Sequence, residues 1–553
     1  MTGAATAGIP AAAGTPDRLV ATTKPADVAA ERRTASRHLT LLAALLTAHA
    51  LLAWTVRQRG IFTFGDDASY LLLSRSLRAL SYREIQFVGE PIAGRFPPGY
   101  PALLAVLGSV FGERLDVIAV AGILLSICGL VALFDVVRRR WSPGLALLVT
   151  AVVAVNPVLV SNAGATASET MFTTLALWTL WAVDRADPLG AHTPPGARKA
   201  VGSGALAIAT ALTRSAGVTL GLALGLHWLY RRRHRRVVIL GVTGMLTVGA
   251  WLAWTVVAPR REVRRSYVDD AINVRVDSSS FGQTLIHRLA TNTSTYVGQS
   301  ILTELHLPVT KRTQLDNVAW VAVLGTLLLA GLWSAWRRWN IVVWYVATYS
   351  LLLAAWTWVI ERFLDPIIPL VLALVLIGAR VIGARVRAGW LLPVATGVVL
   401  AGCALIGDAR LVERAEACDR ARVECAEPAS IDFVDAATYI GQHTPAGSRI
   451  IAPKAGTLYY FARRQSLFWD EVISRDTASF PVLLRDDSVS YILTTPVFSD
   501  HHTLLRLALH ECATLDLVRA FSQQTLLLAV RPDRAADEDR GQACRALARA
   551  LGT

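Results

Sequence analysis

Two adjacent carboxylates, Asp66 and Asp67, lie in the segment FTFGDDASYLLLSRSL, a few residues after the first long apolar run of the chain. A carboxylate about 3 Å from a hydroxyl can take its proton and act as a general base. Because neighbouring carboxylates raise the pKa of one of the pair, we predict a base that operates near neutral pH. The alternative is that the pair caps the amphipathic stretch ASYLLLSRSLRAL, and capping by one carboxylate leaves the other available for catalysis.

Further charged residues lie near the ends of later apolar runs. Glu169 opens one run, Arg214 lies in a short break, and Arg362 begins another run in the segment WVIERFLDPIIPL. An ionisable residue at membrane depth is costly and therefore indicates function. Arginines here can hold a phosphate while a carboxylate deprotonates a hydroxyl. The alternatives are that Glu169 caps a helix and that Arg362 pairs with Glu361 or reaches the lipid headgroups.

The composition indicates a membrane protein. Of the 553 residues, 53% are hydrophobic and 17% are charged, whereas soluble domains carry roughly 25% charged residues. The net charge of +14 comes mainly from arginines. Their clusters at 138–140, 231–236 and 337–338 adjoin apolar runs, as the positive-inside rule predicts for cytoplasmic loops. This placement argues against a nucleic-acid partner.

The apolar runs have the length that a bilayer requires, about 20 residues for each helix. We expect a polytopic α-helical protein with about eleven transmembrane helices, interfacial helices and a small C-terminal extracytoplasmic α/β domain. The predicted spans lie approximately over 38–56, 116–137, 142–162, 169–184, 200–214, 215–230, 237–257, 317–336, 340–359, 367–385 and 389–407.

This reading divides the chain into three parts. Residues 1–37 are predicted to be a disordered cytoplasmic tail, and 38–407 a membrane module. The module has a first outer loop at 57–115, which carries the acidic pair, and a second at 258–317. The remainder, 408–553, is predicted to be the extracytoplasmic domain. Its four cysteines suit two disulfides in an oxidising compartment, which agrees with a plasma-membrane protein whose N-terminus is cytoplasmic.

Three motifs together resemble the polytopic GT-C glycosyltransferases. The similarity is to the bacterial branch related to protein O-mannosyltransferases, aminoarabinose transferases and Rgt-type enzymes, and it covers roughly residues 38–407. The motifs are Asp66-Asp67-x-x-Tyr70, Pro97-Pro98-Gly99-Tyr100-Pro101 and Arg362-Phe363-x-x-Pro366-x-x-Pro369.

The resemblance implies transfer of a sugar from a polyprenyl-phosphate donor to a glycan, glycolipid or protein acceptor at the outer face of the membrane. It makes Asp66 the general base, with Asp67 as its neighbour, and lets Glu169 orient the acceptor or assist a metal. Arg362 would hold the donor phosphate with Arg95 or Arg214. The tyrosines of the motifs, Tyr70 and Tyr100, are the remaining expected substrate-binding residues.

One departure concerns metal binding. Some members carry a metal-binding glutamate just before the Pro-Pro helix, where this chain has Arg95-Phe96, and Glu90 is out of register. A divalent metal ion therefore stays an open alternative, with no ligand assigned.

Two other function classes compete with sugar transfer. A transporter or lipid flippase also places ionisable residues inside a helical bundle, but it favours charges near mid-span and inverted repeats. No repeat is visible here, and the charges lie near the ends of the runs. A non-catalytic receptor built around the C-terminal domain would leave the acidic pair and the arginine motif unexplained.

Overall fold

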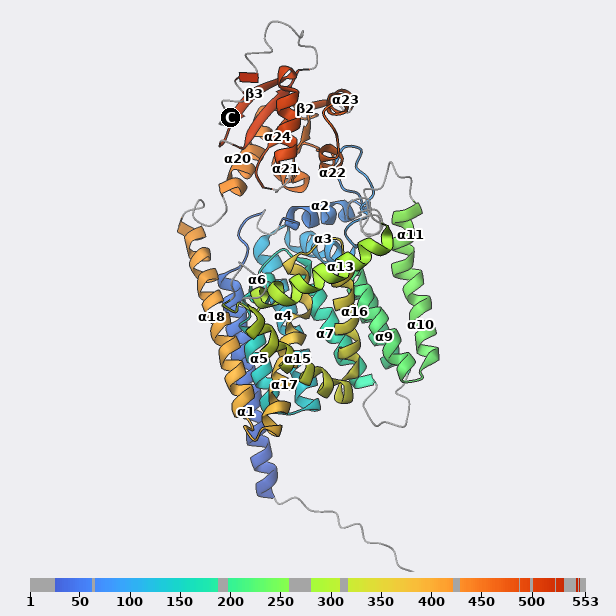
Figure 1. Ribbon diagram of the computed structural model, residues 1–553, viewed down its shortest axis with the longest axis vertical. Coiled ribbons are helices and arrows are strands. Elements are labelled where there is room, and N and C mark those ends of the chain that lie inside the picture. Colours follow the sequence, from blue (N-terminus) through green and yellow to red (C-terminus); the bar gives the residue numbers. More distant parts are fainter. Residues whose placement is uncertain are drawn as a thin grey trace, which may run out of the picture.

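The computed structural model describes two connected bodies, a long helical bundle and a smaller α/β domain that lies over one end of it (Figure 1). The described residues are 25–61, 65–186, 197–257, 280–308, 317–420, 428–486, 488–497, 501–522, 524–531, 544–545 and 547.

The bundle consists of apolar helices that alternate in direction. Six of them are long and apolar enough to cross a membrane, and α5 with α6, bent by 67°, forms a seventh candidate. The predicted count of about eleven stays a prediction. The helices are α1 (Pro25–Thr55), α4 (Leu115–Arg140), α5 (Pro143–Ala154), α6 (Pro157–Ala163), α7 (Ser168–Ala186), α8 (Ala197–Thr213), α9 (Val218–Tyr230), α10 (His234–Gly244), α11 (Ala250–Val257), α15 (Val318–Arg338), α16 (Asn340–Ala355), α17 (Ile368–Arg385) and α18 (Leu391–Arg420).

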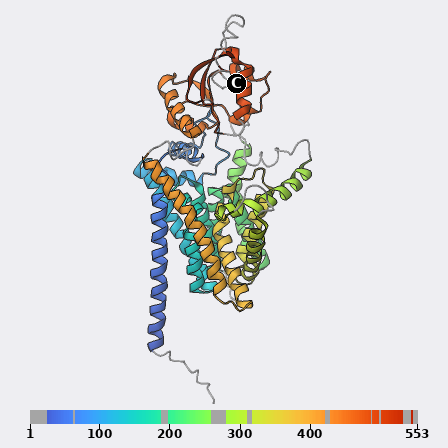
Figure 2. The same cartoon turned by 60° about the vertical axis from the view of Figure 1, so that its left-hand side comes forward.

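The first helix corrects one prediction. Because α1 begins at Pro25, the expected disordered tail over 1–37 is wrong for its last part. Figure 2 shows α1 as a straight rod that extends beyond the bundle at the end away from the C-terminal domain. The remaining residues of the predicted tail, 1–24, lie outside the described residues.

The core of the bundle is built around α17, whose apolar residues from Leu370 to Ile377 are all buried. Its neighbour α15 approaches very closely at two glycines. A Cβ at Gly331 would lie 1.9 Å from the Leu374 carbonyl oxygen, and one at Gly378 would lie 1.8 Å from that of Leu327. Small residues let two backbones touch in this way, so these positions hold the two helices together without side chains between them.

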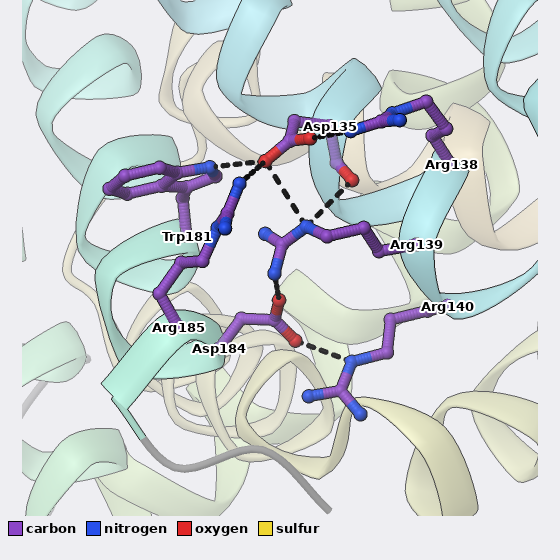
Figure 3. Close-up of polar contacts among 7 residues, drawn as sticks. All are labelled: Asp135, Arg138, Arg139, Arg140, Trp181, Asp184 and Arg185. Carbon is purple, nitrogen blue, oxygen red and sulfur yellow. Dashed lines mark hydrogen bonds and ion pairs between the residues drawn. The ribbon is translucent and has the colours of Figure 1, made fainter. Parts of the chain in front are cut away.

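Acidic residues tie the arginine-rich ends of the helices together (Figure 3). Asp184 of α7 is fully buried and forms ion pairs with Arg139 at 2.7 Å and Arg140 at 2.5 Å, both at the end of α4. Asp135 forms ion pairs with Arg138 and Arg185, and its carboxylate accepts a hydrogen bond from the indole N–H of Trp181. The arginine clusters at 138–140 and 337–338 meet here as well, because Arg338 donates to the Arg140 carbonyl oxygen.

Replacing Asp184 by asparagine is expected to lower the free energy of unfolding by about 1–3 kcal/mol, because the partly buried Arg140 guanidinium loses its carboxylate partner and Arg139 keeps only Asp135. Thermal unfolding of the purified protein in detergent measures the effect. The matched control is Arg138→Gln, which removes a guanidinium that is 46% exposed and should change stability by less than about 1 kcal/mol. Equal losses of unfolding free energy in the two variants would contradict the stabilising role given to the buried Asp184.

Three segments cover the other end of the bundle. The amphipathic α2 (Asp67–Arg78) and the apolar α3 (Gly99–Phe111) lie within the predicted first loop, residues 57–115. The second loop contributes α13 (Phe281–Thr295), η3 (Tyr296–Ser300) and α14 (Ile301–Glu304). Between α16 and α17 the chain makes two short turns, η5 (Glu361–Phe363) and η6 (Asp365–Ile367).

The C-terminal domain contains a four-stranded sheet with the order β1-β2-β4-β3, in which only the first pair is parallel. One of the two expected disulfides, Cys512–Cys544, is present, and the other two cysteines of the tail lie outside the described side chains. The elements are α20 (Pro428–His443), β1 (Arg449–Ile451), α21 (Ala455–Ala462), α22 (Trp469–Ile473), α23 (Phe480–Asp486), β2 (Val489–Thr494), α24 (His501–His510), β3 (Leu515–Ala520) and β4 (Leu526–Val530).

This domain is joined directly to the first loop. The Ser466 N–H donates to the Gln86 carbonyl oxygen at 2.9 Å, and the Val88 N–H donates to the Ser466 carbonyl oxygen at 3.1 Å. At Gly456 of α21 a Cβ would lie 2.7 Å from the Ser69 hydroxyl of α2, so this glycine allows the two helices to touch. The contacts fix the domain over the residues that the sequence predicted as the site.

Candidate active site

Asp66 and Arg362 form an ion pair, although 296 residues separate them in the sequence. Asp66 immediately precedes α2, and its side chain makes no capping hydrogen bond to that helix. Arg362 lies in η5, where the chain turns before entering α17. The capping alternative for Asp66 and the pairing of Arg362 with Glu361 therefore give way to a contact between the two predicted motifs.

Positive charges control the ionisation of Asp66. Burial opposes its ionisation, but the charges of Arg362, Lys454 and Arg214 together outweigh burial and hold the pKa of Asp66 below its ordinary value. The expectation that Asp67 would raise this pKa is wrong. The reason is geometric, because the two side chains enter different environments.

Asp67 belongs to a separate buried network. Its side chain is fully buried, and one carboxylate oxygen accepts from the Gln58 amide at 2.7 Å while the other accepts from the Ala68 N–H. The Gln58 amide oxygen in turn accepts from the Thr166 N–H at 2.7 Å. This network fastens the start of α2 to the segment before α7, and so fixes the position of Asp66.

Glu169 and Arg214 form a second ion pair next to the first. The carboxylate of Glu169, in the first turn of α7, lies 2.5 Å from the Arg214 guanidinium, and both side chains are largely buried. Arg214 also donates to the Ser168 hydroxyl, which is 2.9 Å from the Tyr70 hydroxyl. The break between α8 and α9 thus delivers Arg214 to the start of α7.

The two tyrosines of the motifs pack against each other. The ring centroids of Tyr70 and Tyr100 are 5.0 Å apart in an edge-to-face arrangement, and Phe96 packs on the other side of Tyr70 at 5.1 Å. Burial raises the pKa of both tyrosines, so both hydroxyls are protonated. This cluster supports α2 against α3 and presents the Tyr70 hydroxyl toward Ser168.

A cavity of about 130 Å³ brings together four of the eight predicted site residues. Asp66, Glu169, Arg362 and Tyr70 line it. Carboxylates and the Arg362 guanidinium therefore share one cavity at the end of the bundle. The further lining residues are Val158, Ser161, Asn162, Thr166, Ala167, Glu304 and Asp365.

A second cavity, of about 270 Å³, lies on the other side of the ion pair, between the bundle and the C-terminal domain. Asp66 and Arg362 line this cavity too, together with Arg95 and Lys454. The Lys454 amino group donates to the Gly65 carbonyl oxygen at 3.4 Å. Three cations therefore surround one carboxylate, which gives the cavity the charge that a phosphate requires.

Sequence reasoning missed Lys454 and Glu304. Lys454 is an isolated lysine in a tail without a motif, and only the packing of α21 on α2 brings it to the site. Glu304 lies in the second loop, and its carboxyl group is buried beside Glu361 and Asp365. Asp365 itself accepts from the Asn162 amide at 2.7 Å, while its other oxygen has no hydrogen-bond partner among the described residues.

Burial, and then the charge of Glu361, raise the pKa of Glu304 to about 7. The folded protein therefore holds a proton that the unfolded chain loses near pH 4.5, and stability falls as the pH rises between these values. We expect Glu304→Gln to match the parent in melting temperature at pH 5. At pH 8 it should exceed the parent, by about 1–3 kcal/mol in unfolding free energy.

Melting curves of parent and variant from pH 5 to 8 test this expectation. Glu413→Gln, which alters an exposed carboxylate of α18, serves as the control and should show no pH-dependent difference. A constant offset between Glu304→Gln and the parent at every pH would show that Glu304 is ionised throughout.

Within the described ranges, no three His, Cys, Asp or Glu side chains gather closely enough to hold a metal ion. We therefore assign no ligand set around Glu169.

Solved structures share this architecture. ArnT from Cupriavidus metallidurans in the apo state aligns with a TM-score of 0.58 at 16% identity, over 90% of this chain and 99% of ArnT. The same protein bound to undecaprenyl phosphate gives 0.56 at 14% identity, with the same coverage. An oligosaccharyltransferase from Archaeoglobus fulgidus, in complex with Zn and sulfate, gives 0.53 at 12% identity, over 86% of this chain and 71% of its own. No family model and no curated protein matches the sequence.

Proposed function

We propose, from the GT-C fold that this chain shares with both of those proteins, that it is a membrane glycosyltransferase. Its donor is a sugar linked to a polyprenyl phosphate, and its acceptor is a hydroxyl of a cell-envelope glycan, glycolipid or protein. The observation that carries the proposal is the ion pair between Asp66 and Arg362, an acid and a cation that together line two cavities.

In the proposed reaction, the acceptor hydroxyl oxygen attacks the anomeric carbon of the donor sugar, and Asp66 takes the hydroxyl proton. The bond between the anomeric carbon and the phosphate oxygen breaks, and polyprenyl phosphate leaves with the electron pair. Arg362 balances the negative charge that develops on this phosphate. The phosphate thereby competes with Asp66 for the guanidinium, and this competition increases the basicity of Asp66 when the donor is bound.

The other residues support these two. Arg95 and Lys454 line the second cavity with Arg362, and they would share the charge of the donor phosphate. Glu169 would orient the acceptor, and its carboxylate is held directly by Arg214. Arg214 in turn donates to the Ser168 hydroxyl, which contacts the Tyr70 hydroxyl. Asp67 acts on the reaction only by positioning Asp66.

The orientation in the membrane belongs to the same proposal. The arginine-rich ends of α4 and α15 lie together, away from the C-terminal domain (Figure 1). By the positive-inside rule that end faces the cytoplasm, so the N-terminus is cytoplasmic and the site and the C-terminal domain face outward in the plasma membrane. The proposed limits of the membrane module and of the extracytoplasmic domain are 38–407 and 408–553.

A transporter or flippase of envelope precursors is not favoured. The ionisable residues of the site lie at the ends of helices beneath a covering domain. A transporter would instead carry them near mid-span in broken helices.

Two measurements test the proposal. A strain that lacks the protein should accumulate a polyprenyl-linked sugar and make a truncated envelope glycan, as measured by mass spectrometry of lipid extracts. Purified protein should then release polyprenyl phosphate from that lipid when the acceptor is added. Absence of release in the presence of both substrates would overturn the proposal.

A further inference from the structure

A third cavity, of about 540 Å³, lies between α8, α9 and α10, remote from the candidate active site. Its wall is apolar, and the residues of α8 and α10 that face it include Gly204, Ile208 and Leu240. Trp228 of α9, which is only 3% exposed, contributes to the same wall. One end of the cavity is strongly basic and is formed by Arg232, Arg233, His234, Arg235 and Arg236.

The basic end is a tight turn with a defined backbone. Arg232 has a φ of +55°, and the Arg233 N–H donates to the Trp228 carbonyl oxygen at 2.7 Å, which ends α9. Helix α10 starts at the next residue, and Arg233 makes no side-chain capping bond to it. The guanidinium groups and the start of α10 therefore lie at the same end of the cavity, where an anion would be stabilised.

Several observations indicate what occupies the cavity. Among the described residues no acidic side chain lines it, so its wall supplies no counter-charge for Arg232, Arg233 and Arg235. The Nε of Arg233 is buried and has no hydrogen-bond partner among the described residues. The candidate span His234–Thr255 has none of its apolar window buried, so it faces lipid along its length. An occupant must therefore combine an anionic head with an apolar chain.

We propose that this cavity binds an anionic phospholipid of the bilayer. Its phosphodiester lies at the turn formed by 232–236, and one acyl chain lies along the apolar faces of α8 and α10. Basic pockets between transmembrane helices on the cytoplasmic side bind lipid headgroups of this kind. The lipid fills the space between α10 and the bundle, where α10 has no buried residue of its own.

The arginines at the end of α15 provide a contrast. Arg337 lies over the Trp333 ring at 4.8 Å, and Arg338 donates to the Arg140 carbonyl oxygen at 3.0 Å. Like the arginines at 232–236, they lie at the end of an apolar helix, as the positive-inside rule predicts, but they do not line this cavity. They are therefore the matched control for a charge effect that does not depend on the cavity.

Native mass spectrometry of the full-length protein, titrated with phosphatidylglycerol or phosphatidylcholine, tests the proposal. The parent should prefer phosphatidylglycerol by about tenfold or more, given about 1 kcal/mol for each basic residue near a membrane surface. The triple variant Arg233→Gln, Arg235→Gln, Arg236→Gln should lose this preference, and the double variant Arg337→Gln, Arg338→Gln should keep it. Equal binding of the two lipids by the parent would overturn the proposal, as would a preference that survives the triple substitution.

A second variant leaves the charges unchanged. Ala205→Phe places a ring in the apolar part of the cavity and should weaken phosphatidylglycerol binding several-fold while the arginines remain. Melting curves provide the second readout, in which phosphatidylglycerol raises the melting temperature of the parent more than that of Ala205→Phe. Stabilisation of the parent by inorganic phosphate to the same extent would show an ion site without a lipid, and would also overturn the proposal.

Discussion

Replacing Asp66 by asparagine is expected to lower the turnover number by about 10²–10⁴-fold, the usual contribution of a general base. Asparagine preserves the size of the side chain but cannot take the acceptor proton. The measurement is the rate at which the purified variant releases polyprenyl phosphate from the lipid-linked donor. Because binding of the donor does not require the base, the Michaelis constant for the donor should change far less than turnover.

Two controls separate chemistry from structure. Asp116→Asn alters a carboxylate near the same face that is 54% exposed and paired with Arg57, and it should retain parental activity. Asp67→Asn disturbs the buried network around Gln58, so it should reduce the melting temperature more than Asp66→Asn does. Asp66→Asn with more than a tenth of parental turnover would remove Asp66 from the role of base.

The pH dependence of the parent's activity follows from the ion pair between Asp66 and Arg362. Since Arg362 and Lys454 hold the pKa of Asp66 below its ordinary value in the donor-free protein, the base is ionised throughout the neutral range. The quantity kcat/KM reports the free enzyme, so it should show no loss from Asp66 until the pH falls below about 4. The stability that this ion pair contributes is likewise present above the ordinary carboxyl pKa and is lost as the pH falls through the folded value.

Replacing Arg362 by glutamine is expected to reduce kcat/KM by about 10²–10³-fold, because the leaving phosphate loses its principal counter-charge. Arg362→Lys should give an intermediate loss, since lysine keeps the charge but lacks the planar fork that binds two oxygens. The rate of polyprenyl phosphate release at several donor concentrations gives kcat/KM for both variants. Unlike Asp66→Asn, these variants should also weaken binding of undecaprenyl phosphate, which a thermal-shift titration detects.

Arg57→Gln is the matched control for this loss of charge, because Arg57 lies on the same face and pairs with Asp116 outside both cavities. It should leave kcat/KM within a factor of two or three of the parent, as expected for a pair whose carboxylate is exposed. The double variant Asp66→Asn, Arg362→Gln should show a smaller fold-loss in kcat/KM than the product of the two single fold-losses. The reason is that the two groups act on one reacting centre. Parental phosphate binding by Arg362→Gln would contradict the proposal.

The sequence by itself predicted where the main apolar helices lie and which residues are candidates for the chemistry. Apolar runs predicted the helices around α4, α15 and α17, since length and hydropathy are local properties. The motifs containing Asp66 and Arg362 predicted two residues that do meet. The sequence also predicted the α/β character of the C-terminal residues from short β-rich stretches.

Only the tertiary structure decided the partners of these residues. It turned Asp67 toward Gln58 and Asp66 toward Arg362, which reversed the expected shift in the pKa of Asp66. It also brought Lys454 beside Gly65, across 389 residues of sequence. Ionisation depends on burial and on charges within a few ångströms, and the packing of distant helices sets both, so no pattern within a short segment could have revealed them.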